Sequence, residues 1–274
     1  MNYQPFSVAI SVYKDDNPLF FDRALESITL KQTIMPSEIV LVVDGPVSNE
    51  IDEVIHKYSL ICAMKTIRLE QNRGLGNALK IATENSSYEL IARMDSDDIS
   101  ISDRFEQQLR FFSENKDVDI VGGNITEFVG EESNIVATRF VPSSNDDIRE
   151  YMKKRCAMNH VSVMFKKSAI MKAGGYQDWY HNEDYYLWIR MWLIGCCFLN
   201  TNTILVNVRT GKDMYARRGG LQYYKSEKKL QKFMLKKKII KFHTYCMNVL
   251  KRFIVEILLP NKVRGFVFKR IARR

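Results

Sequence analysis

Short, continuous apolar segments alternate with segments of helical spacing from residue 6 to residue 121, and this alternation restricts the possible fold more than any other feature. The apolar segments are rich in β-branched residues and predict strands at Phe6–Tyr13, Glu38–Val43, Met64–Leu69, Glu89–Met94 and Val118–Val121. The segments between them predict helices at Leu19–Leu30, Ile51–Tyr58, Leu75–Thr83 and Ser102–Phe112. Strands that are apolar throughout and alternate with helices indicate a mostly parallel sheet covered on both faces. Such sheets bind ligands beyond the carboxyl ends of their strands.

The rest of the chain is less regular. We expect a strand at Val161–Phe165, a helix from Asn182 to Leu193, and two short strands within Cys197–Val208 on either side of Asn200–Asn202. Ser226–Leu259 has the spacing of one long helix or two shorter helices. The sequence contains no internal repeat and no low-complexity linker.

The charge of the chain changes sign near residues 210–220. Residues 1–211 contain 22 Lys and Arg against 29 Asp and Glu, whereas residues 212–274 contain 19 against 3. The net charge of +9 therefore combines two opposite parts. We divide the chain into an α/β domain, residues 1–215, and a basic helical C-terminal extension, residues 216–274. This asymmetry predicts that the extension contacts a polyanion or an anionic surface.

Cysteine usage and hydropathy predict a cytoplasmic protein. The five cysteines are odd in number and show no CxxC spacing, which argues against a disulfide framework or a zinc site and favours a reducing compartment. Only five residues precede the first apolar segment and none is basic, so we expect no signal peptide. No apolar run approaches the ~18 residues that a membrane-spanning helix needs.

The acidic motif Asp95-Ser96-Asp97-Asp98 directly follows the predicted strand at residues 89–94. Carboxylates crowded at one strand end repel each other. A hard divalent cation such as Mg²⁺ or Mn²⁺, held by one or two of them plus diphosphate oxygens, removes that repulsion. The cation also neutralises charge that grows on a departing nucleotide diphosphate. A solvated acidic turn that caps the next helix explains the same residues.

Two further motifs lie at strand ends. Asp44 ends the second strand, where its carboxylate suits hydrogen bonds from a nucleobase or ribose, although Asp44-Gly45-Pro46 is also typical of a turn. The loop of residues 72–76 contains Arg73, which suits a phosphate, and glycines that allow the backbone to approach a ligand closely. Helix-start chemistry explains this loop as well, since it matches neither GxGxxG nor a P-loop.

An acidic pair, Glu183-Asp184, opens the predicted helix of residues 182–193. A helix N-terminus favours the ionised carboxylate, which in a cleft can take a proton from a hydroxyl. Stabilisation of the first helical turn is the alternative explanation. His160 and the segment Arg217–Gly220 are uninformative by themselves.

Ten short segments, taken in order, resemble glycosyltransferase family 2, in particular its bacterial members that build capsule, exopolysaccharide and O-antigen units; amylovoran-type transferases are the most similar. The segments are SVYKDDNP (11–18), EIVLVVDGP (38–46), NRGLGNAL (72–79), ELIARMDSDD (89–98), RFEQQ (104–108), DIVGGNI (119–125), HVSVMFKKS (160–168), GGY (174–176), EDYYLWIRM (183–191) and RRGG (217–220). One departure from the family pattern is Lys80 and Ala82, where the family usually has Asn and Gly.

The resemblance implies a GT-A fold, a Rossmann-like α/β domain, and inversion of the anomeric carbon. Asp97 falls on the family's metal ligand, and Asp95 falls near both ribose and metal. Asp184 matches the catalytic base of the family's Glu-Asp motif, with Glu183 beside it. The other positions that the resemblance assigns to donor binding are Val12, Tyr13, Asp44, Arg73, Ser96 and Arg218.

The resemblance also implies Mn²⁺ or Mg²⁺, a nucleotide-sugar donor that is most commonly a UDP-sugar, and a saccharide acceptor on polyprenyl diphosphate. Because such an acceptor stays in the membrane, we expect the basic extension to lie on the anionic inner leaflet as an amphipathic helix. The apolar residues expected on that face are Leu230, Phe233, Met234, Ile240, Phe242, Val249, Leu250, Phe253, Ile254 and Ile257. The alternative is that these residues dock on the enzyme's own core.

Other classes of protein agree less well with the sequence. A nucleic-acid-binding protein needs a recognition motif, which is not present, and the body is acidic. A nucleotide-binding oxidoreductase needs GxGxxG after the first strand, where SVYKDD (11–16) stands instead. An inactive scaffold predicts loss of Asp97 or Asp184, and both are present. A nucleotide- or nucleic-acid-binding protein without transferase activity is the alternative function.

Overall fold

The computed structural model describes residues 3–211 and 219–259. Its strands are β1 (Phe6–Val12), β2 (Glu38–Val43), β3 (Met64–Arg68), β4 (Leu90–Met94), β5 (Ile99–Ser100), β6 (Val118–Phe128), β7 (Ile135–Arg139), β8 (Met164–Lys166) and β9 (Cys197–Arg209). Its helices are α1 (Pro18–Ile28), α2 (Asn49–Ser59), α3 (Leu75–Asn85), α4 (Arg104–Glu114), α5 (Asn145–Met152), α6 (Lys167–Lys172), α7 (Glu183–Leu193), α8 (Leu221–Lys236) and α9 (Phe242–Phe253), with helical turns η1 (His160–Ser162) and η2 (Ile254–Leu258).

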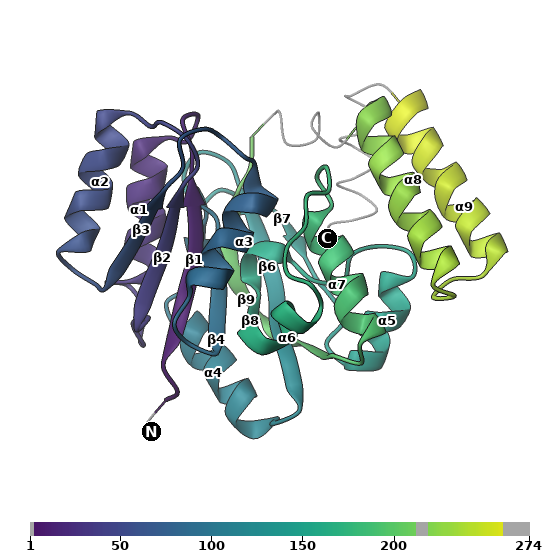
Figure 1. Ribbon diagram of the computed structural model, residues 1–274, viewed down its shortest axis with the longest axis horizontal. Coiled ribbons are helices and arrows are strands. Elements are labelled where there is room, and N and C mark those ends of the chain that lie inside the picture. Colours follow the sequence, from purple (N-terminus) through teal and green to yellow (C-terminus); the bar gives the residue numbers. More distant parts are fainter. Residues whose placement is uncertain (1–2, 212–218, 260–274) are drawn as a thin grey trace.

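The strands form one sheet in the order β3-β2-β1-β4-β8-β6-β9-β5, with β7 paired to β6 (Figure 1). β1, β2, β3 and β4 are parallel, whereas β8 is antiparallel to both β4 and β6. The predicted α/β sheet flanked by helices is therefore confirmed. β2 and β4 lie on opposite sides of β1, so the winding reverses there and leaves a crevice at the carboxyl ends of β1 and β4.

Helices cover both faces of the sheet, and alternate strand residues face two separate cores. Val8 and Ile10 of β1 pack with α1, α2 and α4 in one core. Ala9 of β1 and Val42 of β2 pack with α3, α7 and α8 in the other core. This burial on both faces explains why the first strands are apolar throughout.

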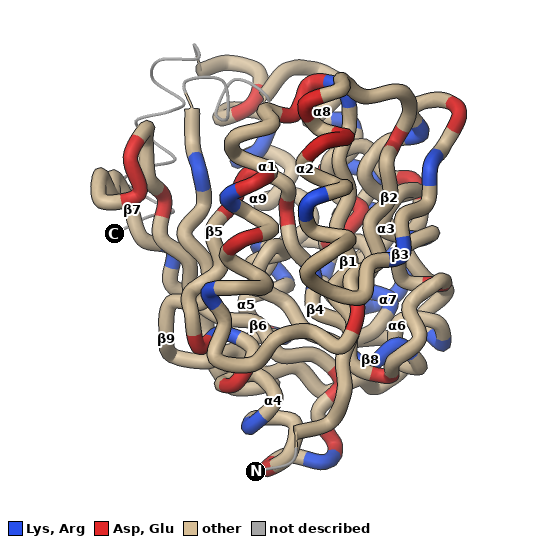
Figure 2. Tube along the Cα trace, turned by 90° about the vertical axis from the view of Figure 1, so that its left-hand side faces the viewer, with Lys and Arg blue, Asp and Glu red and all other residues tan. Residues whose placement is uncertain are grey.

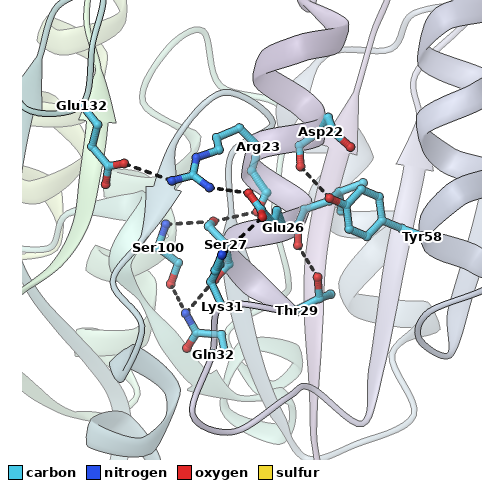
Figure 3. Close-up of polar contacts among 12 residues, drawn as sticks. Asp22, Arg23, Glu26, Ser27, Thr29, Lys31, Gln32, Tyr58, Ser100 and Glu132 are labelled. Atoms are coloured by element: carbon cyan, nitrogen blue, oxygen red, sulfur yellow. Dashed lines mark hydrogen bonds and ion pairs between the residues drawn. The ribbon is translucent and has the colours of Figure 1, made fainter.

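Polar contacts fasten α1 to the segment that follows the acidic motif (Figure 3). The backbone N–H of Ser100, in β5, donates to Oγ of Ser27 at 3.0 Å, and Nε2 of Gln32 donates to Oγ of Ser100 at 3.2 Å. Arg23 reaches Glu132, in the β6–β7 turn, at 3.4 Å. Because β5 directly follows residues 95–98, these contacts hold the chain in place where it leaves the acidic motif.

Several elements differ from the sequence prediction. β9 is one strand and not two short strands around Asn200–Asn202. It pairs with β6 along its length, and shifts in the register of this pairing accommodate the residues that interrupt the pattern. β6 continues well beyond its predicted end at Val121. The predicted strand Val161–Phe165 is replaced by the η1 turn and the short β8. β5, β7, α5 and α6 have no counterpart in the prediction.

α8 and α9 form an antiparallel pair at the edge of the molecule, with α9 outermost (Figure 1). The sequence allowed one long helix or two shorter helices, and the structure shows two. Leu230 and Met234 of α8, and Ile240 from the turn after it, are buried in the same core as Trp188 of α7. These three residues were expected on a membrane face, and the structure places them in the protein's own core instead. In the part of the chain that the structure describes, no helix is both long and apolar enough to span a bilayer.

Candidate active site

The strand register brings several predicted site residues to one edge of the sheet. β1 pairs with β2 up to Val12 opposite Val43, and with β4 up to Ile10 opposite Met94. The loops that follow these strands therefore begin side by side. The backbone N–H of Asp44 donates to the carbonyl of Val12 at 2.8 Å, which joins the first two loops directly.

Asp44 holds the loop of residues 72–76 against the end of β2. Its Oδ1 accepts a hydrogen bond from the backbone N–H of Arg73 at 2.7 Å, and its Oδ2 accepts one from Gly74 at 2.9 Å. Gly45 has a φ of 91°, and a Cβ there would lie 2.8 Å from the backbone N of Asn72. The two loops thus interlock, and only glycine fits between them. The role of Asp44 toward a base or ribose stays a prediction.

The first carboxylates of the acidic motif have unlike surroundings. Asp95 forms a two-pronged ion pair with the buried Arg93, in which both terminal guanidinium nitrogens meet carboxylate oxygens. Burial, followed by the negative charges of Asp95 and Asp16, raises the pKa of the Asp97 carboxyl to about 6. The mutual repulsion expected from the sequence is therefore present in the folded site.

Asp16 connects the end of β1 to the acidic motif. Its Oδ2 accepts a hydrogen bond from the backbone N–H of Tyr13 at 3.0 Å and one from the hydroxyl of Ser96 at 2.9 Å. Burial raises the pKa of Asp16 to about 6, although both hydrogen bonds oppose that shift. Tyr13 and Ser96, two predicted donor-binding residues, are thus held together by a carboxylate that the prediction did not assign.

The last carboxylate of the motif faces β9. Asp98 is buried and accepts a hydrogen bond from the backbone N–H of Arg209 at 2.8 Å. The Arg209 side chain donates to the carbonyl of Asp97 at 3.1 Å and lies over the rings of Phe20 and Phe128, at 3.8 Å and 4.7 Å from their centroids. Asp98 therefore fixes the motif to the end of β9.

Glu183 and Asp184 occupy the first turn of α7, as the sequence predicts. A Cβ on Gly76 would lie 3.4 Å from Cβ of Glu183, so the N-termini of α3 and α7 approach each other. Burial, then the charge of Asp184, raises the pKa of Glu183 to about 7, and burial raises the pKa of Asp184 as well. Two converging helix N-termini favour anions, which suits both ionised carboxylates and a diphosphate.

A cavity of about 270 Å³ joins the acidic motif to the acidic pair. Asp95, Asp98 and Asp184 all line it. His160 also lines it and shares a 2.9 Å hydrogen bond with the hydroxyl of Tyr176, while burial lowers the pKa of His160 well below its ordinary value and keeps the ring neutral. The C-terminal hairpin of α8 and α9 contributes further lining residues, Tyr223, Glu227, Arg252 and Glu256.

Most predicted site residues lie within this one region of the structure. The residues at the sheet edge and at the two adjoining helix N-termini are Val12, Tyr13, Asp44, Arg73, Asp95, Ser96, Asp97, Glu183 and Asp184. Arg218 lies outside the described residues. The sequence analysis missed Asp16, Arg93 and the cavity position of His160. Asp16 carried a usable signal, a carboxylate just after a buried strand, and Arg93 carried another, a charge inside an apolar strand.

Asp95 and Asp97 fit a cation that is bound together with a substrate. Across residues 3–211 and 219–259, no group of three His, Cys, Asp or Glu side chains is arranged to hold a metal ion. One or two carboxylates suffice for Mg²⁺ or Mn²⁺ when diphosphate oxygens and water complete the coordination. Burial, and then repulsion by Asp95 and Asp16, raises the pKa of Asp97, and such a cation would relieve the repulsion.

An α/β sheet with an acidic motif at its strand edge, and an acidic pair across a shared cavity, defines the class of GT-A glycosyltransferases. The chain belongs to the family described as glycosyl transferase family 2, whose family model matches residues 7–178. It is 38% identical over 269 residues to the UDP-Gal:alpha-D-GlcNAc-diphosphoundecaprenol beta-1,3-galactosyltransferase of Escherichia coli, which covers 98% of this chain and 97% of that protein. It is 35% identical over 265 residues to the amylovoran biosynthesis glycosyltransferase AmsE of Erwinia amylovora, with 97% and 98% covered.

Solved structures share the fold. S. aureus TarS 1–349 in complex with UDP-GlcNAc superposes with a TM-score of 0.67 at 16% identity, covering 91% of this chain and 72% of that one. The mannosyltransferase PcManGT from Pyrobaculum calidifontis, in complex with GDP-Man and Mn²⁺, gives a TM-score of 0.63 at 13% identity, with 99% and 76% covered. The predicted GT-A fold and glycosyltransferase family are confirmed.

Proposed function

We propose that this glycosyltransferase moves a hexose from a UDP-sugar to a sugar carried on a lipid diphosphate, with inversion of the anomeric carbon. The observation that carries the proposal is the cavity shared by Asp184 and the acidic motif, which offers a proton acceptor next to a donor site. The substrates follow the E. coli relative, whose name gives UDP-Gal and GlcNAc-diphosphoundecaprenol.

Asp184 is the general base in this proposal. Its ionised carboxylate takes the proton of the acceptor hydroxyl while the hydroxyl oxygen bonds to the anomeric carbon. The bond from that carbon to the UDP oxygen breaks on the opposite face, so one displacement inverts the centre. Arg73, together with Arg218 beyond the described residues, stabilises the negative charge on the departing UDP. Glu183 sits next to the base and titrates with it.

Asp97 and Asp95 would hold the divalent cation, which supplies charge neutralisation for the leaving diphosphate when bound. We expect chelator to abolish transfer and Asp97→Ala to do the same. Calorimetry should show in parallel that UDP binds more weakly without Mn²⁺ or Mg²⁺. Full activity with chelator present, or in Asp97→Ala, would remove the metal from the proposal.

A donor and acceptor panel tests the reaction itself. Purified enzyme is incubated with UDP-Gal, UDP-Glc, UDP-GlcNAc, GDP-Man or a dTDP-sugar, and with synthetic GlcNAc-diphosphate-lipid. We expect a UDP-hexose to give product, and nuclear magnetic resonance to show the inverted anomer. Matched acceptors that lack the diphosphate should react poorly. Transfer from GDP- or dTDP-sugars alone would contradict the assignment of UDP.

We further propose that α9 in the extension, residues 216–274, holds the enzyme on an anionic membrane surface. An ordinary surface helix turns its apolar side chains toward the core of the protein. In α9 the apolar side chains face outward. Phe242, Leu250 and Ile254 are 70%, 54% and 41% exposed. Apart from Tyr245, which packs against the core, the inward face has polar contacts: Asn248 donates to the carbonyl of Lys153 at 2.9 Å, and Arg252 pairs with a buried glutamate.

The charge of the hairpin complements an anionic surface. In residues 219–259 the two carboxylates, Glu227 and Glu256, are 4% and 3% exposed and lie beside Arg252. The exposed lysines of the same segment are Lys225, Lys228, Lys229, Lys232, Lys236, Lys237, Lys238, Lys241 and Lys251. The side of the body formed by α1 and α2, in contrast, mixes both signs (Figure 2). Each Lys near an anionic bilayer adds about 1 kcal/mol of attraction.

The position of α9 gives membrane docking a consequence for the reaction. Its outward face is apolar, whereas its inward residue Arg252 and the following Glu256 line the cavity that contains Asp184. A helix is about 10–12 Å across with its side chains. A bilayer against the outer face of α9 therefore lies about one helix diameter from the cavity, within reach of a sugar on a lipid diphosphate.

Vesicle co-sedimentation tests this docking. The full chain should sediment with phosphatidylglycerol vesicles and not with phosphatidylcholine vesicles, and added salt should weaken the binding. Truncation after Gly220 is a poor test because it removes Leu230 and Met234 from the core. Equal binding to both kinds of vesicle, or to neither, would contradict the membrane proposal and favour a soluble acceptor.

A further inference from the structure

Arg93 is a charged residue in the middle of a buried strand. Its side chain is 2% exposed, and it stands in β4 two residues before Asp95. Successive strand side chains alternate between faces, so residues 93 and 95 share one face. Both terminal nitrogens of Arg93 meet the Asp95 carboxylate, whose side chain is 34% exposed toward the cavity. Arg93 therefore holds the Asp95 carboxylate from the side of the protein interior, and the other side of the carboxylate faces the cavity.

This ion pair is poorly explained by stability alone. Burying a guanidinium is costly, and a buried ion pair often stabilises a protein no better than apolar residues of the same volume. Nε of Arg93 has no hydrogen-bond partner in the described structure, so the group is not even fully satisfied. The geometry it provides is specific, because a guanidinium fork fixes both oxygens of a carboxylate at once.

A second buried arginine provides a direct comparison. Arg104 of α4 is 0% exposed and lies under the same strand end, where it donates to the carbonyl of Arg93 at 2.8 Å and to that of Val163 at 3.3 Å. Its Nε donates to Gln108 at 3.1 Å. Arg104 therefore joins backbone segments, and within the described residues it forms no hydrogen bond or ion pair with a carboxylate of the site. Both arginines are buried and lie near the end of β4. They differ in their partners, since Arg93 pairs with a carboxylate and Arg104 with backbone carbonyls.

We propose that Arg93 is a positioning residue that fixes the Asp95 carboxylate in the orientation that binds the donor nucleotide. The inference rests on the proposed role of Asp95 at the ribose and cation. Without the paired guanidinium nitrogens, the Asp95 side chain can rotate freely at the edge of the cavity. The nucleotide then loses a hydrogen-bond acceptor that is already oriented toward it. In the proposed reaction the acceptor hydroxyl meets Asp184 and not Asp95, so binding of the acceptor sugar should change little.

The test compares Arg93→Lys with Arg104→Lys, each measured for the KM of the UDP-sugar, the KM of the acceptor, the dissociation constant of UDP with Mn²⁺, and Tm. Lysine keeps the charge and loses the fork. Replacing a residue that orients a ligand group typically costs about 10–100-fold. We expect Arg93→Lys to raise the donor KM and the UDP dissociation constant within this range, with the acceptor KM changed less than twofold. Arg104→Lys should lower Tm and leave both donor constants unchanged.

A double variant keeps the test meaningful if Arg93→Lys does not fold. Arg93→Met with Asp95→Asn removes both charges together and leaves no unpaired buried cation. If Arg93 acts through Asp95, this pair binds UDP no more weakly than Asp95→Asn alone. An additional loss in the pair, or unchanged UDP binding in a folded Arg93→Lys, would overturn the positioning role. Unchanged UDP binding in Asp95→Asn would instead overturn the proposed role of Asp95 itself.

Discussion

Polar substitution on the outer face of α9 should separate membrane binding from folding. Leu250 and Ile254 are about half exposed, and fully burying such a side chain is worth about 1.5–3 kcal/mol. Moving only their exposed parts into a bilayer interface therefore contributes about 1 kcal/mol each. Leu250→Gln with Ile254→Gln should weaken partitioning to anionic vesicles by about 2 kcal/mol, which is about 30-fold. Stability should change little, since exposed substitutions usually stay within about 0.5 kcal/mol.

Leu230→Ala is the matched control on the same hairpin. Leu230 is 0% exposed and packs in the core that contains Trp188. Its truncation should cost about 2–5 kcal/mol of unfolding free energy through lost burial and a residual cavity. Vesicle binding of the protein that remains folded should be unchanged, because the side chain faces inward.

The two variants are compared by vesicle co-sedimentation and by urea unfolding, both at 25 °C and at fixed salt. The expected pattern is reciprocal: one variant loses binding at wild-type stability, and the other loses stability at wild-type binding. If Leu250→Gln with Ile254→Gln destabilises the fold as much as Leu230→Ala and binds vesicles normally, then the exposed stripe of α9 is not the membrane face.

Three further predictions concern the catalytic pair and the sheet. Asp184→Asn should lower kcat by about 10²-fold or more with UDP binding retained; near wild-type turnover would move the base elsewhere. Because burial raises the pKa of Glu183 to about 7, above its ordinary 4.5, ionising it costs stability as pH rises through this window, so Glu183→Gln should raise Tm at pH 8 and not at pH 4. An equal effect at both pH values would rule out that cause. Gly123→Ala should cost about 1–3 kcal/mol in urea unfolding, because its Cβ would lie 2.4 Å from Oγ1 of Thr201; a neutral effect would show that β9 yields there.

The parallel half of the sheet could be predicted because its strands are short, mostly apolar segments that alternate with helices, although β3 carries Lys65 and Arg68. The other half, which combines the parallel pair β6 and β9 with the antiparallel strands β5, β7 and β8, could not be predicted in the same way. β9 contains Asn200 and Asn202, which interrupt the apolar pattern and predict a turn. In the fold, Nδ2 of Asn200 donates to the carbonyls of Pro142 and Ala157, at 2.7 Å and 3.1 Å, so the amide nitrogen of a polar residue finds its partners inside a continuous strand. Such partners are distant in the sequence and carry no local signal.

The site could be predicted where a motif coincides with a strand end or a helix start, as with Asp44, Asp97 and Asp184. It could not be predicted where a residue acts through tertiary contact. Asp16 becomes part of the site only because the loop after β1 folds back onto Ser96. His160 precedes the predicted strand Val161–Phe165, and it reaches the cavity because a helical turn, His160–Ser162, replaces the start of that strand.

The C-terminal hairpin shows why periodicity alone does not decide which face of a helix turns inward. The sequence reports that α9 is amphipathic, but it does not report which face is turned inward. The choice depends on Glu227, which α8 places under α9, where it pairs with Arg252 at 2.7 Å. Pairing this carboxylate avoids a buried unpaired charge, whose cost exceeds that of leaving apolar side chains in water. The polar face of α9 therefore turns to the protein and the apolar face is left outside, where an anionic bilayer is the surface that matches its lysines.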